Sequence, residues 1–454
     1  MVEGKSAVKT PEARPGHNLS ASLRMQERAR RAIPGMTQLL SKRPDQFSLG
    51  MWPGYYSKAE GAHVWDLDGN RYLDMSIAGI GANVLGYADP DVDSAVIAAV
   101  RGGTSSSLNC PEEVELAELL CELHPWADQA RFARTGGEAM AMAVRAARAA
   151  SGRDVVAFCG YHGWHDWYLA ANVGTENALG EHLLAGLDPL GVPKALAGTA
   201  VPFRYNRLDE LEHAVAEIGD RIGVIVMEPR RGEAPKPGFL EGVREIADRL
   251  KAVLVFDEIS SGFRLTTGGV HLALGIDPDM AVFSKALGNG YAIAAVIGRR
   301  GVMDAFQRTF ISSTQWTERV GPAAALATVR KHRAAKVPDR LEWLGQGVRQ
   351  AWNDASARHG VPIEISGFPA MSYLSFSHPE NLTLRALFVE AMMDKGLLAG
   401  GRYYAMAAHT EEHVAAYAAA CNHAFGAIAK AVQSGEPGRW LRGKPASSGF
   451  KRLA

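Results

Sequence analysis

The sequence has few of the residues and patterns that mark disulfide-rich, metal-binding or membrane-spanning proteins. Only four of its 454 residues are cysteines, and none belongs to a Cys-x-x-Cys pair or to a Cys/His cluster at ligand spacing. We therefore expect free thiols in a reducing compartment and no zinc site. No stretch approaches the length of a membrane span, and the polar first residues lack the apolar core of a signal peptide. These absences predict a cytoplasmic protein without a membrane partner.

An excess of charge of either sign is also missing. The chain has 49 basic and 49 acidic side chains, so its formal charge is zero and no electrostatic argument favours nucleic acid or an anionic membrane as a partner. No Gly-x-Gly-x-x-Gly motif opens a helix after a first strand, which removes the dinucleotide-binding fingerprint. What remains is an ordinary globular composition, 47% hydrophobic and 22% charged, with enough length for two or three packed units.

Helices and apolar strands alternate from about residue 90 to residue 300. Short runs rich in Val, Ile and Leu between helical patterns predict a mainly parallel sheet that is covered by helices on both faces. The expected strands are residues 155–159, 223–227, 252–256, 280–283 and 292–298. Ahead of them, residues 63–73 have the pattern of a β-hairpin around an Asp-Gly-Asn turn.

The two ends of the chain have a different composition. Residues 1–20 are polar and contain Pro and Gly, which predicts a flexible segment. After about residue 325, a long helix is followed by helices and short strands such as residues 371–376. We therefore expect an α/β protein with a large domain at 91–325 and a smaller α+β domain. The smaller domain is expected to combine residues 21–90 and 326–454.

Lys285 and Asp257 each follow a predicted buried strand. The run 253–256 ends in Asp257, and the run 280–284 ends in Lys285 ahead of a glycine turn. Active groups collect at the carboxyl ends of parallel strands, so we expect this amine and this carboxylate to meet. Pyridoxal phosphate (PLP) needs that pair, an amine for covalent attachment and an anion on the ring nitrogen. The alternative for this spacing alone is a surface lysine beside an unrelated aspartate.

Two further segments would complete such a site. Thr135-Gly136-Gly137 opens a strong helix, so backbone N–H groups and the positive helix end form a phosphate site, although two glycines before a helix occur in many proteins. Tyr161 and His162 follow the strand at 155–159. The ring of Tyr161 can lie flat on a planar cofactor with His162 in polar contact nearby, and the alternative is an aromatic packing cluster.

The remaining candidate residues surround the ring of the cofactor. Glu228 ends another strand and brings a further carboxylate to the same edge. Asp257 would keep the ring nitrogen protonated, and Ile259, on the same side of an extended chain, would cover the second face of the ring. Once a substrate amine displaces it, Lys285 would be a base that moves a proton between substrate carbon and cofactor.

Together, these segments resemble the class III (subgroup II) PLP-dependent aminotransferases, and among them the glutamate-1-semialdehyde 2,1-aminomutase branch. The order of several motifs in one chain is far more specific than any one of them. The matching segments are residues 64–70, 136–139, 161–163, 228–229, 257–259, 262–264, 283–288 and 407–410.

The resemblance implies the PLP-dependent transferase fold type I, with a mainly parallel sheet sandwiched by helices in the large domain. It also implies an obligate homodimer whose active sites lie at the subunit interface. In such a dimer, a threonine of the partner subunit touches the cofactor phosphate. Counting back from Gly321-Pro322, which stands where the family has Gly-Asn-Pro, this threonine is Thr317, with Thr314 as the alternative.

The sequence departs from the family at three places. The phosphate turn is usually Ser-Gly-Thr, whereas here Gly137 removes one hydroxyl. Ser260 replaces a glutamine or methionine. Aminomutases carry an Asn-Ser-Pro-Val-Arg run whose arginine takes the substrate carboxylate, and in residues 37–43 only Lys42 or Arg43 is left for an anion. A lysine does not reproduce the bidentate clamp of an arginine.

These departures favour an aminotransferase that takes an amino group from an amino-acid donor, glutamate or glutamine. The acceptor would be an aldehyde or ketone without a neighbouring carboxylate, for instance an oxidised (amino)sugar of antibiotic biosynthesis. The alternatives are an intramolecular aminomutase, another PLP reaction, or a non-catalytic binding protein, which the joint presence of Lys285 and Asp257 disfavours. No metal is expected.

Two arginines are candidates for contacts with a substrate. Arg264 belongs to a motif that lies near the active site in the family, and its alternative role is a surface ion pair. Arg402 is a candidate for the donor carboxylate, and the alternative is a structural role.

Overall fold

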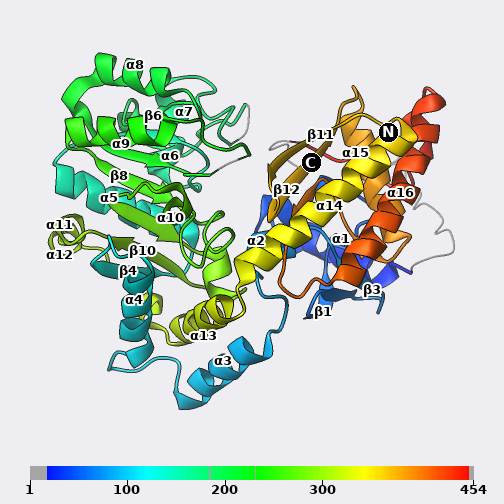
Figure 1. Cartoon of the computed structure of the whole chain (residues 1–454), viewed down its shortest axis with the longest axis horizontal. Coiled ribbons are helices and arrows are strands. Elements are labelled where there is room, and N and C mark those ends of the chain that lie inside the picture. The colour runs from blue at the N-terminus through cyan, green and yellow to red at the C-terminus, as the bar shows by residue number, and fades with distance from the viewer. Residues whose placement is uncertain (1–17, 184–185, 231, 449–454) are drawn as a thin grey trace, which may run out of the picture.

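The computed structural model describes residues 18–183, 186–230 and 232–448. Two lobes lie side by side, joined by α13 (Val320–Ala334) and α14 (Val337–His359) (Figure 1). One lobe holds a seven-stranded sheet, and the other holds two smaller sheets packed against long helices. Except for residues 18–20, the segment expected to be flexible (1–20) lies outside the described residues.

The large sheet is mainly parallel, as expected. Along the sheet the order is β4-β10-β9-β8-β7-β5-β6, and only β10 runs antiparallel to its neighbours. The strands are β4 (Gln129–Ala133), β5 (Val155–Cys159), β6 (Ala200–Pro202), β7 (Ile222–Met227), β8 (Val253–Asp257), β9 (Met280–Phe283) and β10 (Ala294–Gly298). The two edge strands, β4 and β6, were not predicted, because β4 is partly polar and β6 is only three residues long.

Both faces of this sheet are buried by helices. Alternate residues of a strand point to opposite faces, so Val253 and Val255 of β8 pack with α5 (Gly136–Ser151). Leu254 and Phe256 pack with α9 (Phe239–Leu250) on the other face. Complete burial on both sides explains why these strands read as continuous apolar runs and not as alternating ones.

The second lobe joins segments from both ends of the chain. Strands β1 (Tyr56–Glu60), β2 (His63–Asp66) and β3 (Arg71–Asp74) form an antiparallel unit, and β3 pairs in parallel with β13 (Leu397–Leu398). The hairpin expected at residues 63–73 is therefore present. The pairing of β3 with β13 brings segments from both ends of the chain into one lobe. The domain limits at residues 90 and 325 stay predictions.

A three-stranded sheet and two long helices complete this lobe. Its strands are β11 (Ile363–Phe368), β12 (Met371–Phe376) and β14 (Arg402–Tyr404), and α16 (Glu411–Gln433) lies along α14. The other helices are α1 (Ser20–Ala32), α2 (Ala78–Gly81), α3 (Pro90–Gly102), α4 (Pro111–Leu123), α6 (Asp166–Leu169), α7 (Ala171–Gly174), α8 (Leu208–Ile218), α10 (His271–Leu274), α11 (Arg300–Met303), α12 (Ala305–Arg308) and α15 (Asn381–Met393).

All four cysteines carry free thiols. Within residues 18–183, 186–230 and 232–448, no helix combines the length and the apolar character that crossing a bilayer requires. In the same ranges, no group of three His, Cys, Asp or Glu side chains is arranged to hold a metal ion.

The contact between α14 and the turn before β12 leaves no room for a side chain at Gly345. A Cβ there would lie 1.9 Å from the carbonyl oxygen of Pro369. We expect Gly345→Ala to lower the free energy of unfolding by about 1–3 kcal/mol, because this backbone clash outweighs the roughly 1 kcal/mol that alanine adds in helix propensity. Urea unfolding followed by tryptophan fluorescence measures the change. Gly301→Ala is the control, since a Cβ at Gly301 meets nothing within 4 Å; a stable Gly345→Ala protein would contradict the packing.

Candidate active site

Four neighbouring parallel strands deliver the candidate residues to one edge of the large sheet. Tyr161 and His162 follow β5, Glu228 follows β7, and Asp257 is the last residue of β8. Lys285 begins a short 3-10 helix (Lys285–Gly288) and is separated from the end of β9 by Ser284 alone. Because parallel strands present their carboxyl ends at the same edge, residues far apart in the sequence become neighbours here.

Asp257 is a buried carboxylate held from two sides. One of its oxygens accepts the backbone N–H of Ile259 at 3.0 Å, and the other lies 2.8 Å from Nδ1 of His162. Nε2 of His162 lies 3.2 Å from the carbonyl oxygen of Cys159, so both ring nitrogens face oxygen acceptors. The side chain of Asp257 is 4% exposed and that of His162 is 0% exposed. These contacts fix the direction of the carboxylate, and the imidazole of His162 lies against one of its oxygens.

Lys285 has a strained backbone and an unusual partner. Its φ angle is +46°, a left-handed conformation that costs a residue other than glycine about 1–3 kcal/mol. Its Nζ donates a hydrogen bond to Oγ of Ser260 at 2.6 Å. Burial lowers the pKa of Lys285, and the carboxylates of Asp257 and Glu228 oppose this shift. A lysine amine that loses its proton more easily than usual is suited to act as a nucleophile and as a base.

The loop after β5 is anchored to Glu228. The backbone N–H of Tyr161 donates to this carboxylate at 3.2 Å, and a Cβ at Gly160 would lie 2.5 Å from the same group, so only glycine fits there. Tyr161 is 45% exposed, its ring meets that of Tyr168 edge to face, and its hydroxyl feels the negative charge of Asp257.

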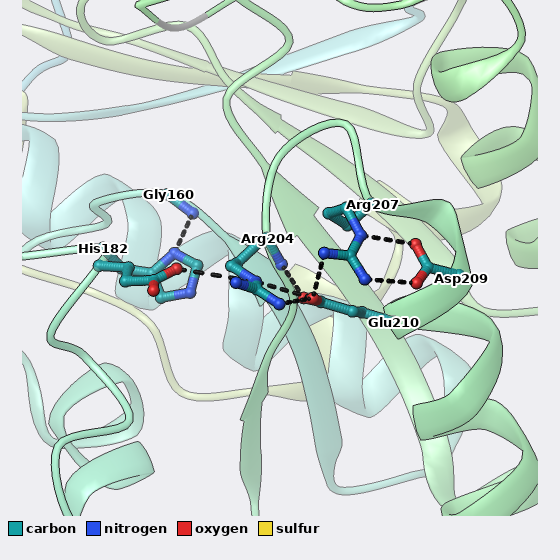
Figure 2. A network of polar contacts seen from close by, with 7 residues as sticks. Gly160, His182, Arg204, Arg207, Asp209 and Glu210 are labelled. Carbon is teal, nitrogen blue, oxygen red and sulfur yellow. Dashed lines mark hydrogen bonds and ion pairs between the residues drawn. The ribbon is translucent and has the colours of Figure 1, made fainter.

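A polar network braces the same loop from outside. The backbone N–H of Gly160 donates to Nδ1 of His182 at 3.3 Å (Figure 2). In the same view, Arg204 and Arg207 both pair with Glu210 at the start of α8, and Arg207 also pairs with Asp209. Arg204 also pairs at 3.7 Å with Glu181, the residue before His182, although exposed ion pairs of this kind contribute little stability.

The first turn of α5 is shaped to receive an anion. Thr135 caps the helix and forms a reciprocal capping box with Glu138. The N–H groups of Gly136 and Gly137 belong to the first turn, where no acceptor exists within the helix. A Cβ at Gly136 would lie 2.8 Å from Ile259, and one at Gly137 would lie 3.0 Å from His165. Both positions therefore need glycine, and the turn fits a phosphate group held by backbone amides.

Thr317 does not join this group within one chain. It ends a short 3-10 helix (Thr314–Thr317), its side chain is exposed, and its hydroxyl donates to the carbonyl oxygen of Thr314 at 2.9 Å. Thr314 is exposed as well. Arg134 ties this segment down through the carbonyl oxygens of Trp316 and Glu318. The contact of Thr317 with the phosphate in another subunit therefore stays a prediction.

The structure gives the two candidate arginines very different surroundings. Arg264 is completely buried and not at the surface, and it donates to the carbonyl oxygens of Gly81 and Ala405. Burial lowers the pKa of Arg264 to about 10. Arg402 lines a small cavity beside Arg385, and among the described residues it forms no ion pair with a carboxylate.

Two contacts of candidate residues were not predicted from the sequence. Arg43, expected as a residue that could take an anion, is buried and bonded to Asp45 through Nε at 2.9 Å and through a second N–H group. Lys42 is exposed. Ser260 appeared only as a departure from the family motif, yet its hydroxyl is the hydrogen-bond partner of Lys285.

Comparison with known proteins gives a consistent picture. The family model "Aminotransferase class-III" matches residues 49–430. The 3-aminobutyryl-CoA aminotransferase of Cloacimonas acidaminovorans is 33% identical, covering 80% of this chain and 85% of its own. The 2'-deamino-2'-hydroxyneamine transaminase of Streptomyces kanamyceticus is 34% identical (82% and 90% covered). A glutamate-1-semialdehyde 2,1-aminomutase of Anaeromyxobacter dehalogenans is 33% identical (84% and 93% covered).

Solved structures agree with the sequence comparison. The PLP form of the FumI protein of Sphingopyxis sp. MTA144 superposes with a TM-score of 0.82 at 26% identity, covering 91% of this chain and 97% of that one. An omega-transaminase from Sphaerobacter thermophilus superposes with a TM-score of 0.80 at 29% identity, covering 90% and 98%.

The electrostatics of Lys285 predict how its reactivity depends on pH. Because burial lowers its pKa, we expect acylation of Lys285 in cofactor-free protein to rise with a midpoint below the ordinary lysine range, near pH 10.4. Glu228→Gln removes a carboxylate that holds the pKa up, so the midpoint should move still lower. Peptide mass spectrometry after labelling over a pH series measures both midpoints. Glu233→Gln, at an exposed glutamate, is the control, and an upward shift in Glu228→Gln would contradict the assignment.

Proposed function

Because the chain belongs to the class III aminotransferase family, we propose that it moves an amino group from an amino-acid donor to an aldehyde or ketone acceptor. The protein is a PLP-dependent aminotransferase of fold type I. The observation that carries the proposal is the position of Lys285 and the buried Asp257 after neighbouring parallel strands, where the carboxylate acts electrostatically on the amine. This pair supplies the amine and the anion that a PLP enzyme needs.

The residues at this edge fit PLP. The amides of Gly136 and Gly137 would hold its phosphate, and Asp257 would face its ring nitrogen. Tyr161 and Ile259 would lie against opposite faces of the ring. When bound, PLP accepts the electrons left on the substrate carbon as that carbon loses its proton.

The protein's own residues supply the acid–base chemistry. The lowered pKa of Lys285 lets its amine take a proton from the substrate carbon at a pH where an exposed lysine stays charged. The hydroxyl of Ser260 holds that amine in place. His162 orients Asp257 through its contact with the carboxylate, and Glu228 would fix the loop that carries Tyr161. Burial of Asp257 and His162 also excludes water from this side of the site.

The arginines suggest what the substrates carry. Arg402 and Arg385 face a cavity of roughly 40 Å³. Burial and the neighbouring charge of Arg402 lower the pKa of Arg385, so an anion between them would relieve this repulsion. Tyr373 interacts electrostatically with both Arg402 and Glu228, which supports a location of Arg402 on the same side of the molecule as Glu228. A carboxylate-bearing donor such as glutamate fits, with Arg402 as its contact.

The acceptor is proposed to lack a carboxylate beside its carbonyl group. Of the two residues left for a second carboxylate, Arg43 is already paired with Asp45, and Lys42 is exposed and lacks the bidentate geometry of an arginine. The similarity to the 2'-deamino-2'-hydroxyneamine transaminase supports an oxidised (amino)sugar as the acceptor. The similarity to the 3-aminobutyryl-CoA aminotransferase also supports an acceptor without a carboxylate beside its carbonyl group. The second candidate is the intramolecular reaction of an aminomutase, supported by relatives of equal identity.

We also propose a homodimer in which Thr317 of each subunit reaches the phosphate of the other. The exposure of this threonine and its distance in sequence from the Gly136 turn support that arrangement.

The first test adds amino donors singly to the PLP-loaded protein, without an acceptor, and follows the cofactor absorbance. We expect glutamate or glutamine to discharge the absorbance while the matching oxo acid appears. Lys285→Ala should fold and show no discharge, because the amine and the base are lost together, whereas Lys251→Ala, at an exposed lysine, should behave like the unaltered enzyme. Turnover by Lys285→Ala beyond a slow background would contradict the assignment of Lys285 as the amine and the base. Consumption of an amino aldehyde without any donor would establish the aminomutase instead.

The cavity between the arginines predicts a selective effect on the donor. Arg402→Gln should raise KM for a carboxylate-bearing donor about 10- to 100-fold, because a charge-assisted hydrogen-bond pair is lost. The KM of an amine donor without a carboxylate should stay within about twofold. Steady-state kinetics with both donors measure the difference. Lys430→Gln, at an exposed lysine, is the control; equal losses with both donors would mean that Arg402 has only a structural role.

A further inference from the structure

The phosphate turn of this chain has lost a side-chain hydroxyl. Position 137 carries glycine, so this part of Thr135-Gly136-Gly137 offers only backbone amides. The hydroxyl of Thr135 is already used inside the turn, since it donates to the carboxylate of Glu138 at 3.0 Å and accepts the N–H of the same residue at 3.4 Å. A dianion bound here would therefore meet fewer side-chain donors than a hydroxyl-bearing turn provides.

The imidazole of His165 occupies the space above Gly137. A Cβ at Gly137 would lie 3.0 Å from Cε1 and 3.1 Å from Nδ1 of this ring. His165 is brought there by the turn at Gly163, whose φ angle is +101° and which packs against Gly137. Trp164 stacks on the imidazole with ring centroids 4.5 Å apart, which limits its rotation. The place of the absent side chain is thus filled by a ring from another segment.

The Nδ1 atom of His165 is buried and has no hydrogen-bond partner among the described residues. Buried polar atoms of this kind are rare, because an unmade hydrogen bond costs about 1–3 kcal/mol. Burial lowers the pKa of His165, while Glu138 and Asp166 oppose the shift. The neutral ring carries one N–H and can place it on Nδ1. In that tautomer the atom is a donor without an acceptor, next to a turn shaped for an anion.

We propose that His165 binds the phosphate group of PLP through Nδ1, in place of the hydroxyl that Gly137 lacks. The proposal depends on PLP binding to this chain, and it is independent of which donor and acceptor the enzyme uses. It also explains the glycine: a larger residue at position 137 would push the imidazole away from the turn. Gly137 and His165 then form a matched pair, each needed because of the other.

The test compares PLP with pyridoxal, which lacks the phosphate. Cofactor-free protein is titrated with each compound and followed by absorbance and by tryptophan fluorescence. We expect His165→Ala to weaken PLP binding about 10- to 100-fold, the effect of losing one charge-assisted hydrogen bond, and to leave pyridoxal binding within about twofold. His213→Ala, at an exposed histidine of α8, is the control and should change neither.

A second set of variants separates the hydrogen bond from packing. His165→Asn keeps an N–H donor near the position of Nδ1 and should bind PLP more tightly than His165→Ala. Gly137→Thr alone should weaken PLP binding, because its Cβ displaces the ring. The double variant Gly137→Thr/His165→Ala should regain affinity, since the threonine hydroxyl then has the space it needs.

Three outcomes would overturn the proposal. The first is an equal loss of affinity for PLP and pyridoxal in His165→Ala, which would indicate a structural role. The second is additive losses in the double variant, which would show that the two positions do not replace each other. The third is unaltered protein that binds PLP no more tightly than pyridoxal, which would remove the phosphate site altogether.

Discussion

A carboxyl group withdrawn from water organises the candidate active site. Asp257 sits at the end of a strand that is buried on both faces, so its oxygens need hydrogen-bond partners within the protein in place of the water they have lost. The backbone N–H of Ile259 and the ring of His162 are these partners. These two contacts join the loop after β5 and the turn after Asp257 to the end of β8. In the proposed function, the same carboxylate faces the ring nitrogen of the cofactor.

The amine of Lys285 experiences the opposite balance. Burial disfavours its charged form and lowers its pKa, whereas the carboxylates of Asp257 and Glu228 favour the charge. The result is an amine that is neutral more easily than an exposed lysine but is still held near two anions. The left-handed backbone conformation of Lys285 costs additional free energy, and the surrounding packing must hold it in place. Strain and desolvation together at one residue are typical of a functional site and not of a residue that only packs.

The two lobes contribute different parts of substrate and cofactor recognition. The large lobe provides rigid strand ends and a helix N-terminus, which suit a bound cofactor. The small lobe provides Arg402 and Arg385 around a cavity, and its sheet contains segments from both ends of the chain. The buried Arg264 links the lobes, because it donates to Gly81 and Ala405 while its own chain continues from β8. If Arg402 binds the donor as proposed, substrate binding would depend on how the small lobe is held against the large one.

The sequence by itself determined the features that rest on local periodicity. Five apolar runs predicted the inner strands. Because the carboxyl ends of parallel strands lie at the same edge of a sheet, the positions of Lys285, Asp257 and Glu228 after these runs predicted that they share one edge. Tertiary structure alone decided the contacts between distant segments. The hydrogen bond of Lys285 to Ser260, the burial of Arg264 and the ring of His165 above Gly137 depend on where side chains meet after packing. Strand patterns repeat every two residues and can be read along the chain, whereas such contacts depend on distances in space that no spacing in sequence encodes.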